Sequence, residues 1–404
     1  MKDLNKNLNP SDHFIISFEN EVLTKCIGCA KCLKECEIIK FSKFANADLR
    51  ELQKKRLDFL ISGTLSNDVY ESAYLCMHCH SCEISCPVDL NTSAINELIK
   101  ARLKERGKAA PFALKLSVPT DKLNAFGILS KVMFNKNEMI WLNEVPDVDV
   151  AVFLGCLYPI VADKVLASFD ILDELGVKFA ALSGGANYCC GALDSMSGNA
   201  KEARERAINL AMALDKLSPR GTILWCSTCY QRLTEISKEE NLPFKCQHII
   251  PFLRDNLERI NFKKTIDKKI TIHDPCHLGR GAGKYDSIRE LLGAIPGVEI
   301  VEMKHTKEKA LCCGGAALFS KPRVAKNMTK QRMVEAQNTG ADILASMCAG
   351  CHMAFCETED KYSFEVQNVI GVLAEAMGIE YEDRLKNHSG ILKRAMGMLR
   401  TFCR

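Results

Sequence analysis

Long hydrophobic runs are missing from this chain of 404 residues. Near the N-terminus only Phe14-Ile15-Ile16 is continuously apolar, and this stretch is too short for the hydrophobic region of a secretory signal. No stretch approaches the roughly 18 apolar residues that a membrane-spanning helix needs. We therefore expect a cytoplasmic protein that reaches the inner face of a membrane only through a partner subunit.

An excess of charge of either sign is missing as well. The chain has 54 lysines and arginines against 50 aspartates and glutamates, and both signs are mixed along it. A net charge of +4 gives no strong field that would attract a polyanion. This balance argues against a nucleic-acid partner, and we expect a protein or small-molecule partner instead.

Fingerprints of nucleotide binding are also missing. Residues 279–284 read Gly-x-Gly-x-Gly-Lys, but Leu278 occupies the place of the first glycine of a phosphate-binding loop. Tyr285 follows the lysine, where such a loop requires serine or threonine. No dinucleotide-binding fingerprint follows a predicted strand elsewhere. We expect no flavin or NAD in this chain and assign any such cofactor to a partner.

Cysteine, in contrast, is abundant, with 21 residues. Two clusters have the C-x2-C-x2-C-x3-C spacing of bacterial ferredoxins, in which the fourth cysteine of each run ligates the cluster of the other run. Three cysteines lie outside all clusters and are interpreted as ordinary thiols: Cys246, Cys356 and Cys403. The ferredoxin runs predict two cubane 4Fe-4S clusters, one on Cys26, Cys29, Cys32 and Cys86, and the other on Cys76, Cys79, Cys82 and Cys36.

Zinc and disulfide bonds are the alternatives for these thiols. A structural zinc ion takes four tetrahedral ligands, and two consecutive four-cysteine runs exceed what such a site requires. Clustered C-x-x-C spacings in a reducing compartment favour metal ligation over disulfides. We therefore interpret both runs as iron-sulfur sites. One departure is Glu37, which stands where proline usually follows the fourth cysteine; it removes no ligand.

The remaining clusters form a tandem repeat. Each has a lone cysteine, an adjacent pair and a C-x-x-C motif, and the second set lies 120, 123 and 122 residues beyond the first at these three blocks. Such an offset indicates duplication of a whole domain. Adjacent cysteines suit a cubic cluster poorly, because one thiol is surplus and neighbouring ligands must splay apart. The two five-thiol sets are Cys156, Cys189, Cys190, Cys226 and Cys229, and Cys276, Cys312, Cys313, Cys348 and Cys351.

Strand-like sequences precede the lone cysteines and the C-x-x-C motifs. A helical pattern at 162–175 follows the first of them, and strands alternating with helices predict parallel α/β units. In such sheets ligands bind beyond the carboxyl ends of the strands, so we expect three cysteine-bearing loops to converge there in each repeat. Gly191 and Gly314 follow the cysteine pairs and let the backbone approach a bulky inorganic core. The strand-like runs are 148–155, 222–225, 270–275 and 343–347.

The predicted fold class is therefore α/β, with a mainly helical domain in front. That domain contains a charged helical stretch at 49–61 and, after the second ferredoxin run, a helix with Ile95, Leu98 and Ile99 on its apolar face and Lys100 pointing elsewhere. The expected segments are a flexible N-terminus at 1–20, a helical two-cluster ferredoxin domain at 21–110, a connector at 111–146, and the two repeats at 147–262 and 263–404.

Both five-thiol sets resemble the CCG domain, C-x(31–39)-C-C-x(35–36)-C-x-x-C, of heterodisulfide reductase catalytic subunits and related iron-sulfur proteins; the second set has 34 residues between its last two blocks. From residue 21 to about 360, the layout resembles the membrane-linked type of that subunit and the iron-sulfur subunit of glycolate oxidase. The resemblance implies one or two noncubane 4Fe-4S clusters in the CCG domains, which flank a disulfide and cleave it, with one iron of each cluster capturing a sulfur.

The resemblance also implies roles for individual residues. All ten thiols of the two five-thiol sets become catalytic as well as metal-binding, and His277 is our candidate proton donor to a leaving thiolate. The implied partner is a redox subunit, either a flavoprotein or a membrane cytochrome-like protein, with a disulfide or thiol as substrate. The other histidines beside the cysteines are interpreted as hydrogen-bond donors to cluster sulfur: His78, His80, His273 and His352.

Two functions remain open. The first is an oxidoreductase subunit that takes electrons through the two cubanes to the paired CCG clusters and reduces a disulfide. Complete cysteine sets in both repeats favour it, because glycolate-oxidase-like subunits often have an incomplete first set. The second is an electron relay within a flavin-dependent hydroxyacid dehydrogenase complex. A zinc-stapled interaction scaffold is a third class, and it predicts a colourless protein.

Overall fold

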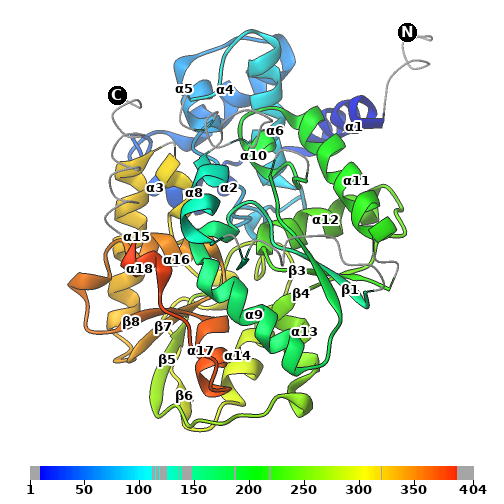
Figure 1. Ribbon diagram of the computed structural model, residues 1–404. Helices are drawn as coiled ribbons and strands as arrows, with labels where there is room; N and C mark the ends of the chain where they lie inside the picture. The colour runs from blue at the N-terminus through cyan, green and yellow to red at the C-terminus, as the bar shows by residue number, and fades with distance from the viewer. Residues whose placement is uncertain are drawn as a thin grey trace.

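The computed structural model has three parts in chain order (Figure 1). The N-terminal helices lie together at one end of the molecule, and two sheet-containing domains lie beside each other below them in this view. The residues that the structure describes are 10–111, 114, 118, 125–135, 137–138, 148–185, 188–217, 220–319 and 321–388.

The N-terminal domain is mainly helical, as predicted. The Asp48 side chain accepts hydrogen bonds from the N–H groups of Arg50 and Glu51 and so begins the predicted helix α4, which Gly63 ends in a left-handed conformation. Ile95 and Ile99 lie in the core of the domain, as expected. The helices are α1 (Pro10–Lys25), α2 (Lys31–Glu35), α3 (Glu37–Lys40), α4 (Leu49–Ser62), α5 (Asn67–Ala73), η1 (Glu83–Ser85) and α6 (Thr92–Glu105).

The segment at 1–20, which we expect to be flexible, is helical from Pro10 onward. Helix α1 begins at Pro10, and its Glu19 carboxylate forms an ion pair with Arg102 of α6. Phe18 packs against the core of the N-terminal domain. This polar sequence is helical because a neighbouring helix supplies contacts that composition alone does not reveal. Residues 1–9 lie outside the described part of the chain.

Each repeat contains a four-stranded parallel sheet, which confirms the α/β prediction. The strand order is β2-β1-β3-β4 in the first repeat and β6-β5-β7-β8 in the second, so the duplicated domains share one topology. The central strands β3 and β7 are buried along their whole length, as expected for a parallel sheet covered on both faces. The strands are β1 (Val150–Phe153), β2 (Phe179–Leu182), β3 (Thr222–Leu224), β4 (Cys246–His248), β5 (Lys268–Ile272), β6 (Val298–Ile300), β7 (Ile343–Ser346) and β8 (Glu365–Asn368).

Helices connect and cover the strands. In the first repeat they are η3 (Tyr158–Val161), α9 (Ala162–Glu174), α10 (Ala192–Met196), α11 (Ala200–Leu217), α12 (Ser227–Glu239), α13 (Ile249–Asp255) and η4 (Leu257–Arg259). In the second they are α14 (Asp286–Gly293), η5 (Lys307–Lys309), η6 (Gly315–Phe319), α15 (Pro322–Gln337), α16 (Ala349–Cys356), η7 (Glu359–Lys361), α17 (Val369–Ala376) and α18 (Arg384–Asn387).

The two repeats pack against each other symmetrically. The helix after the first strand of one repeat meets the helix after the last strand of the other: α9 packs against α17, and α14 packs against α13. Phe169, Leu253, Leu291 and Leu373 from these four helices belong to one hydrophobic core. This shared core fixes the relative position of the two sheets. The connector contributes α8 (Ala125–Met133), which packs on η3; its end near residue 146 lies outside the described ranges.

Lys100 corrects the expectation that it points away from the core. Its side chain is fully buried, and its Nζ donates a hydrogen bond to the carbonyl oxygen of Cys76 at 3.0 Å and lies over the ring of Tyr74. Burial lowers the pKa of Lys100. The helical pattern predicts only one buried face of α6. Helices α10 and α11 of the first repeat also pack against α6, which the pattern does not show.

Replacing Gly191 by alanine is expected to destabilise the first repeat. Gly191 has a φ of 73°, and an added Cβ would overlap the backbone carbonyl of Ala203 in α11. Both effects oppose the native conformation, so we expect the free energy of unfolding to fall by roughly 2 kcal/mol or more. Chemical denaturation followed by circular dichroism measures this. Gly185→Ala is the matched control, because nothing lies within 4 Å of its Cβ position; equal losses in both variants would contradict the explanation.

Candidate metal centres

The second ferredoxin run gathers its thiols as its spacing predicts. Burial, together with the neighbouring Cys79 and Cys76 thiols, raises the pKa of Cys36 to about 12. Burial is the main reason that the pKa of Cys82 is raised. The nearby thiols of Cys76, Cys79 and Cys36 raise it as well. Cys36 therefore lies with the thiols of the other run, which is the exchange of ligands expected of two-cluster ferredoxins.

Thiols of the first run also lie close to one another. Cys32 is influenced by Cys26 and Cys29, although burial is the main reason that its pKa is raised. Helix α2, which carries Cys32, packs against η1, which directly precedes Cys86. The structure thus brings together elements bearing all four predicted ligands of the first cubane.

In both repeats the cysteine-bearing loops converge at the carboxyl ends of the strands. Cys156 and Cys276 follow the central strands β1 and β5, and the adjacent pairs lie in the loops after β2 and β6. Cys226 and Cys348 are the N-terminal caps of α12 and α16, directly after β3 and β7. Three loops on three adjacent strands therefore supply each five-thiol set, as expected for a parallel sheet.

Hydrogen bonds between thiols are alike in the two sets. Cys189 and Cys229 donate to the sulfur of Cys190, which holds the pKa of Cys190 well below its usual range. Cys312 and Cys351 donate in the same way to Cys313 and lower its pKa to about 6. A buried sulfur that is stabilised as a thiolate, with further thiols around it, is the form that iron and zinc bind.

The second ferredoxin run touches the second five-thiol set directly. The Cys79 thiol donates a hydrogen bond to the sulfur of Cys312, and this contact is the largest cause of the raised pKa of Cys79. The Glu37 carboxylate accepts a hydrogen bond from the backbone N–H of Cys312 at 2.6 Å. Arg280 of the second repeat adds a third contact between the two parts: its Nε donates a hydrogen bond to the carbonyl oxygen of Cys79 at 2.9 Å.

His277 lies where the three cysteine-rich parts meet. Its Nδ1 is 3.4 Å from the Cys276 sulfur and 3.3 Å from the hydroxyl of Thr228, which lies between Cys226 and Cys229 of the first set. Its ring meets the edge of the His80 ring at 5.6 Å between centroids. Burial lowers the pKa of His277, which favours the neutral imidazole near pH 7.

A polar pocket adjoins His277. Its walls come from the second ferredoxin run, from the N-terminal part of α6, from α10 after the first cysteine pair, and from α12. The buried His78 Nε2, His80 Nε2 and Ser195 Oγ in this wall have no hydrogen-bond partner among the described residues. Unsatisfied buried polar atoms beside a cavity indicate a place where water or a polar ligand is bound.

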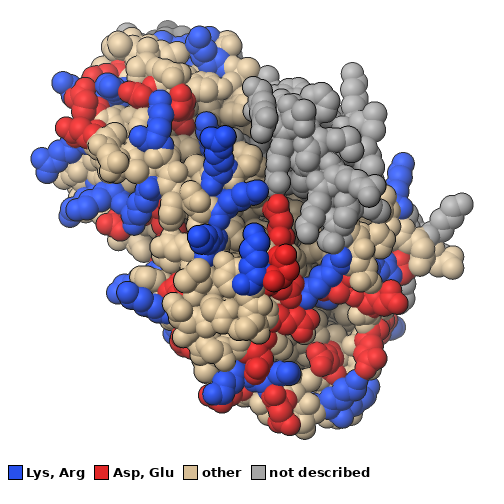
Figure 2. Space-filling model, turned by 90° about the vertical axis from the view of Figure 1, so that its left-hand side faces the viewer, with Lys and Arg blue, Asp and Glu red and all other residues tan. Residues whose placement is uncertain are grey.

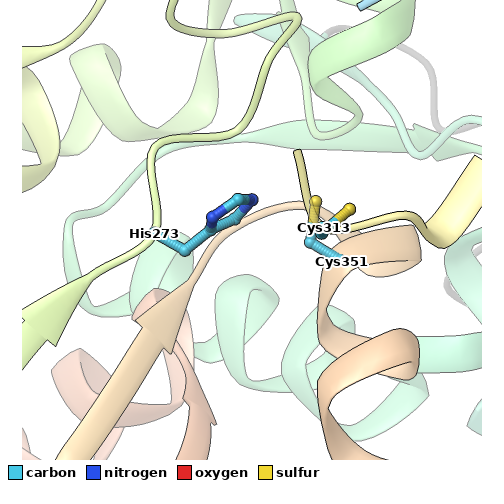
Figure 3. Close-up of side chains that lie close together, drawn as sticks. All are labelled: His273, Cys313 and Cys351. Atoms are coloured by element: carbon cyan, nitrogen blue, oxygen red, sulfur yellow. The ribbon is translucent and has the colours of Figure 1, made fainter. Parts of the chain in front are cut away.

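His273 lies beside two thiols of the second five-thiol set. Its ring nitrogen and the sulfurs of Cys313 and Cys351 all lie within 4.8 Å of one another. Figure 3 shows the imidazole turned toward the two thiols across the end of β5. His352, in contrast, contacts Cys356, with Nε2 at 3.7 Å from its sulfur.

Sequence reasoning missed the charged groups around the thiols. Glu37 was noted only as a departure from proline, and Arg280 and Arg332 were not singled out. Their contacts join segments far apart in the chain, so only an alignment of relatives or a structure could have indicated them. Cys246 in β4 and Cys356 in α16 lie outside the five-thiol sets, and Cys403 lies outside the described residues.

Two family models match the chain. A cysteine-rich CCG domain matches residues 150–234 and again 270–356, and a 4Fe-4S dicluster domain matches residues 22–90. These matches and the converging thiols define the class: an iron-sulfur protein with an N-terminal dicluster domain and two cysteine-rich domains. The residues fit such groups, because free thiols gather at each centre and, in the two repeats, Gly155 and Gly315 lie directly against cysteine side chains.

Relatives identify the family. Over 395 residues the chain is 31% identical to a subunit of dihydromethanophenazine:CoB–CoM heterodisulfide reductase from Methanosarcina mazei, covering 89% of this chain and 95% of that protein. The corresponding protein from Methanosarcina barkeri is 30% identical over 394 residues, covering 88% of this chain and 94% of that protein. The chain therefore belongs to the family of this heterodisulfide reductase subunit.

Other relatives have different names. A subunit of fumarate reductase (CoM/CoB) from Methanothermobacter marburgensis is 26% identical over 373 residues, covering 90% of this chain and 74% of that protein. Lactate utilization protein A 1 from Bacillus mycoides is 26% identical over 246 residues, covering 56% of this chain and 96% of that protein. The chain is thus similar to subunits of redox enzymes.

The surface agrees with the balanced composition. Figure 2 shows basic and acidic side chains interspersed over one face of the molecule, without a large patch of one sign. Among the described helices, none combines the length and the apolar character needed to cross a membrane.

Replacing Glu37 by alanine is expected to weaken the contact between the ferredoxin domain and the second repeat. The Cys312 N–H would lose a charged acceptor, at a cost of roughly 1.5–3 kcal/mol. We expect a lower Tm and less iron per chain in anaerobically purified protein, whereas Glu37→Gln retains an acceptor and loses less. The exposed Glu35, at the end of α2, supplies the control Glu35→Ala. A Glu37→Ala variant as stable as this control would contradict the importance of the contact.

Proposed function

We propose that this chain is the iron-sulfur subunit of an oxidoreductase that reduces a disulfide, of the kind named for its heterodisulfide reductase relatives. In this proposal a partner subunit, a flavoprotein or a membrane cytochrome-like protein, delivers electrons to the N-terminal domain. The two complete CCG cysteine sets then form the reaction site. Reduction of RS–SR′ consumes two electrons and two protons and yields RSH and R′SH.

The observation that carries the proposal is the position of His277 between the two five-thiol sets. It contacts Cys276 of the second set and Thr228 of the first, and it borders the polar pocket. A substrate in that pocket would lie beside Thr228, from the C-x-x-C motif of the first set, and beside His277, which contacts Cys276 of the second. A reaction that divides a disulfide into two thiols requires such a place between the two sets. The contact of Cys79 with Cys312 supports transfer from the second ferredoxin run into the second repeat.

The chain's own residues would hold the cofactors in place. The ferredoxin runs would bind two cubane 4Fe-4S clusters, and the five-thiol sets would bind one or two noncubane clusters. When bound, such clusters supply single electrons and, in the CCG sites, iron to which a sulfur can bind. The thiolates of Cys190 and Cys313, each stabilised by two neighbouring thiols, are central in the two proposed ligand sets.

His277 would act mainly by position. Its lowered pKa disfavours the protonated imidazolium at pH 7. It is therefore better suited to orient a sulfur or a water molecule by a hydrogen bond than to donate a proton. The neighbouring carboxylate of Glu235 lines the same pocket, and burial raises its pKa. Glu235 is therefore a second candidate for supplying protons to the departing thiolates.

An electron relay for a dehydrogenase complex is the second candidate function. The relatives named for fumarate reductase and lactate utilization favour it. In a relay the CCG domains would pass electrons to or from another subunit, and the polar pocket would hold only water. The two functions therefore differ in whether a thiol binds at the five-thiol sets.

Electron paramagnetic resonance on anaerobically purified, redox-poised protein separates the two functions. We expect a new signal when coenzyme M or coenzyme B thiol is added to oxidised protein, because a substrate sulfur would bind at a CCG site. Cys313→Ala should abolish or alter this signal, whereas Cys246→Ala, at a thiol outside the sets, should leave it unchanged. Signals from reduced cubanes alone, indifferent to thiol, would support the relay.

A further inference from the structure

The two CCG domains have matching thiols but differ in the buried side chains next to them. The contacts of Gly191 with Ala203 and of Gly314 with Ala325 align α11 of the first repeat with α15 of the second. This alignment places Leu210 opposite Arg332. Three residues before the lone cysteine, the first repeat has Phe153 and the second has His273. Apolar residues of the first repeat are thus replaced by a polar pair in the second.

This polar pair belongs to a buried network. The Arg332 side chain is fully buried, and its Nε donates a hydrogen bond to Nδ1 of His273 at 3.1 Å. Its Nη1 donates to the Glu335 carboxylate at 2.7 Å and to the carbonyl oxygen of His305 at 2.8 Å. The residue aligned with Glu335 in the first repeat is Ala213, which cannot form such an ion pair.

The network orients the imidazole toward the thiols. Because Nδ1 of His273 accepts the Arg332 hydrogen bond, the ring proton of the neutral imidazole lies on Nε2. His273 lies within 4.8 Å of the sulfurs of Cys313 and Cys351, as Figure 3 shows. Nη2 of Arg332 is buried without a hydrogen-bond partner among the described residues. The Nε2–H of His273 is therefore a donor from which a sulfur-rich group in this site could accept a hydrogen bond.

Backbone N–H groups donate to both sets, including that of Gly315 to Cys313, whereas the second set also receives the Cys79 thiol at Cys312. The N–H of Gly191 donates to Cys189 and that of Gly314 to Cys312, at 3.3 and 3.4 Å. Glu335 neutralises Arg332, so this pair adds no net charge to the second site. His277, at Cys276, belongs to the site described above. The difference that a single substitution can isolate is the imidazole N–H of His273, which has phenylalanine as its counterpart in the first repeat.

We infer that His273, held by the positioning residue Arg332, donates a hydrogen bond to the sulfur atoms of the second CCG site and makes its cluster easier to reduce than that of the first. This inference rests on the proposed function, because it assumes that both CCG domains hold clusters. Hydrogen bonds to sulfur raise the potential of an iron-sulfur cluster, since they stabilise the more negative reduced state. The cluster beside Cys79 would then be the stronger electron acceptor of the two.

Replacing His273 by phenylalanine gives the second repeat the residue of the first. In a redox titration of the full chain followed by electron paramagnetic resonance, we expect the ratio of reduced to oxidised second-site cluster to fall about tenfold at the wild-type midpoint potential. For a one-electron couple this is a shift of about 59 mV to lower potential. The titration is repeated in a chain that also carries Cys190→Ala, which removes a proposed ligand of the first site. A signal that persists in this chain is assigned to the second site.

Conservative variants separate the hydrogen bond from packing. His273→Gln keeps an N–H donor and should restore part of the potential, and Arg332→Lys keeps the charge but loses the planar donor and should shift it as His273→Phe does. Phe153→Leu in the first repeat should leave the second site unchanged. These variants also serve if His273→Phe fails to fold.

The inference is overturned if His273→Phe, with wild-type iron content, leaves the second-site midpoint unchanged, or if His273→Gln shifts it as far as His273→Phe. A different outcome tests the proposed function: iron analysis that finds no cluster in the second CCG domain of the wild-type chain would remove the premise, whatever the variants do.

Discussion

Crowding of buried thiols is the constraint on which the rest of this structure depends. Burial disfavours the thiolate, as the raised pKa of Cys36 shows, and yet thiolates are the form that binds metal. Within each five-thiol set, one sulfur accepts hydrogen bonds from neighbouring thiols, and these hydrogen bonds lower its pKa. Metal binding would stabilise the other buried sulfurs as thiolates. Folding and cofactor binding are therefore expected to be coupled in this chain.

The arrangement of the domains follows from that constraint. Parallel strands place their following loops at one edge, so three short loops gather five thiols without a long excursion of the chain. The shared core of α9, α13, α14 and α17 then holds the two edges in a fixed relation. The N-terminal helices lie against both, through Lys100 and the helices over it on one side and through Glu37 on the other.

Much of this could be predicted from the sequence. The cysteine spacings indicated the domain order, and strand-like runs located β1, β3, β5 and β7 because buried parallel strands are short, apolar and rich in β-branched residues. The family follows from the same spacings. These features are local, or repeat at a fixed offset, so a single sequence contains them in full.

What the sequence could not show depends on contacts between distant segments. Glu37 meets Cys312, and Arg332 meets His273, across separations that no periodic pattern reports. Lys100 is polar by type but fully buried, with its Nζ against Cys76 and Tyr74 from another segment of the N-terminal domain. Residues 10–20 look like a frayed end until α6 is placed beside them. In each case tertiary packing overrides the preference that residue type or local pattern indicates.

In the function proposed here, two CCG sites face each other across His277, and the second ferredoxin cluster lies beside the second of them. Anomalous diffraction at the iron edge, from crystals grown anaerobically, would locate every metal centre at once. We expect iron at all four cysteine clusters, with the two CCG sites on either side of His277. Zinc in place of iron, or iron confined to the ferredoxin domain, would refute the proposal.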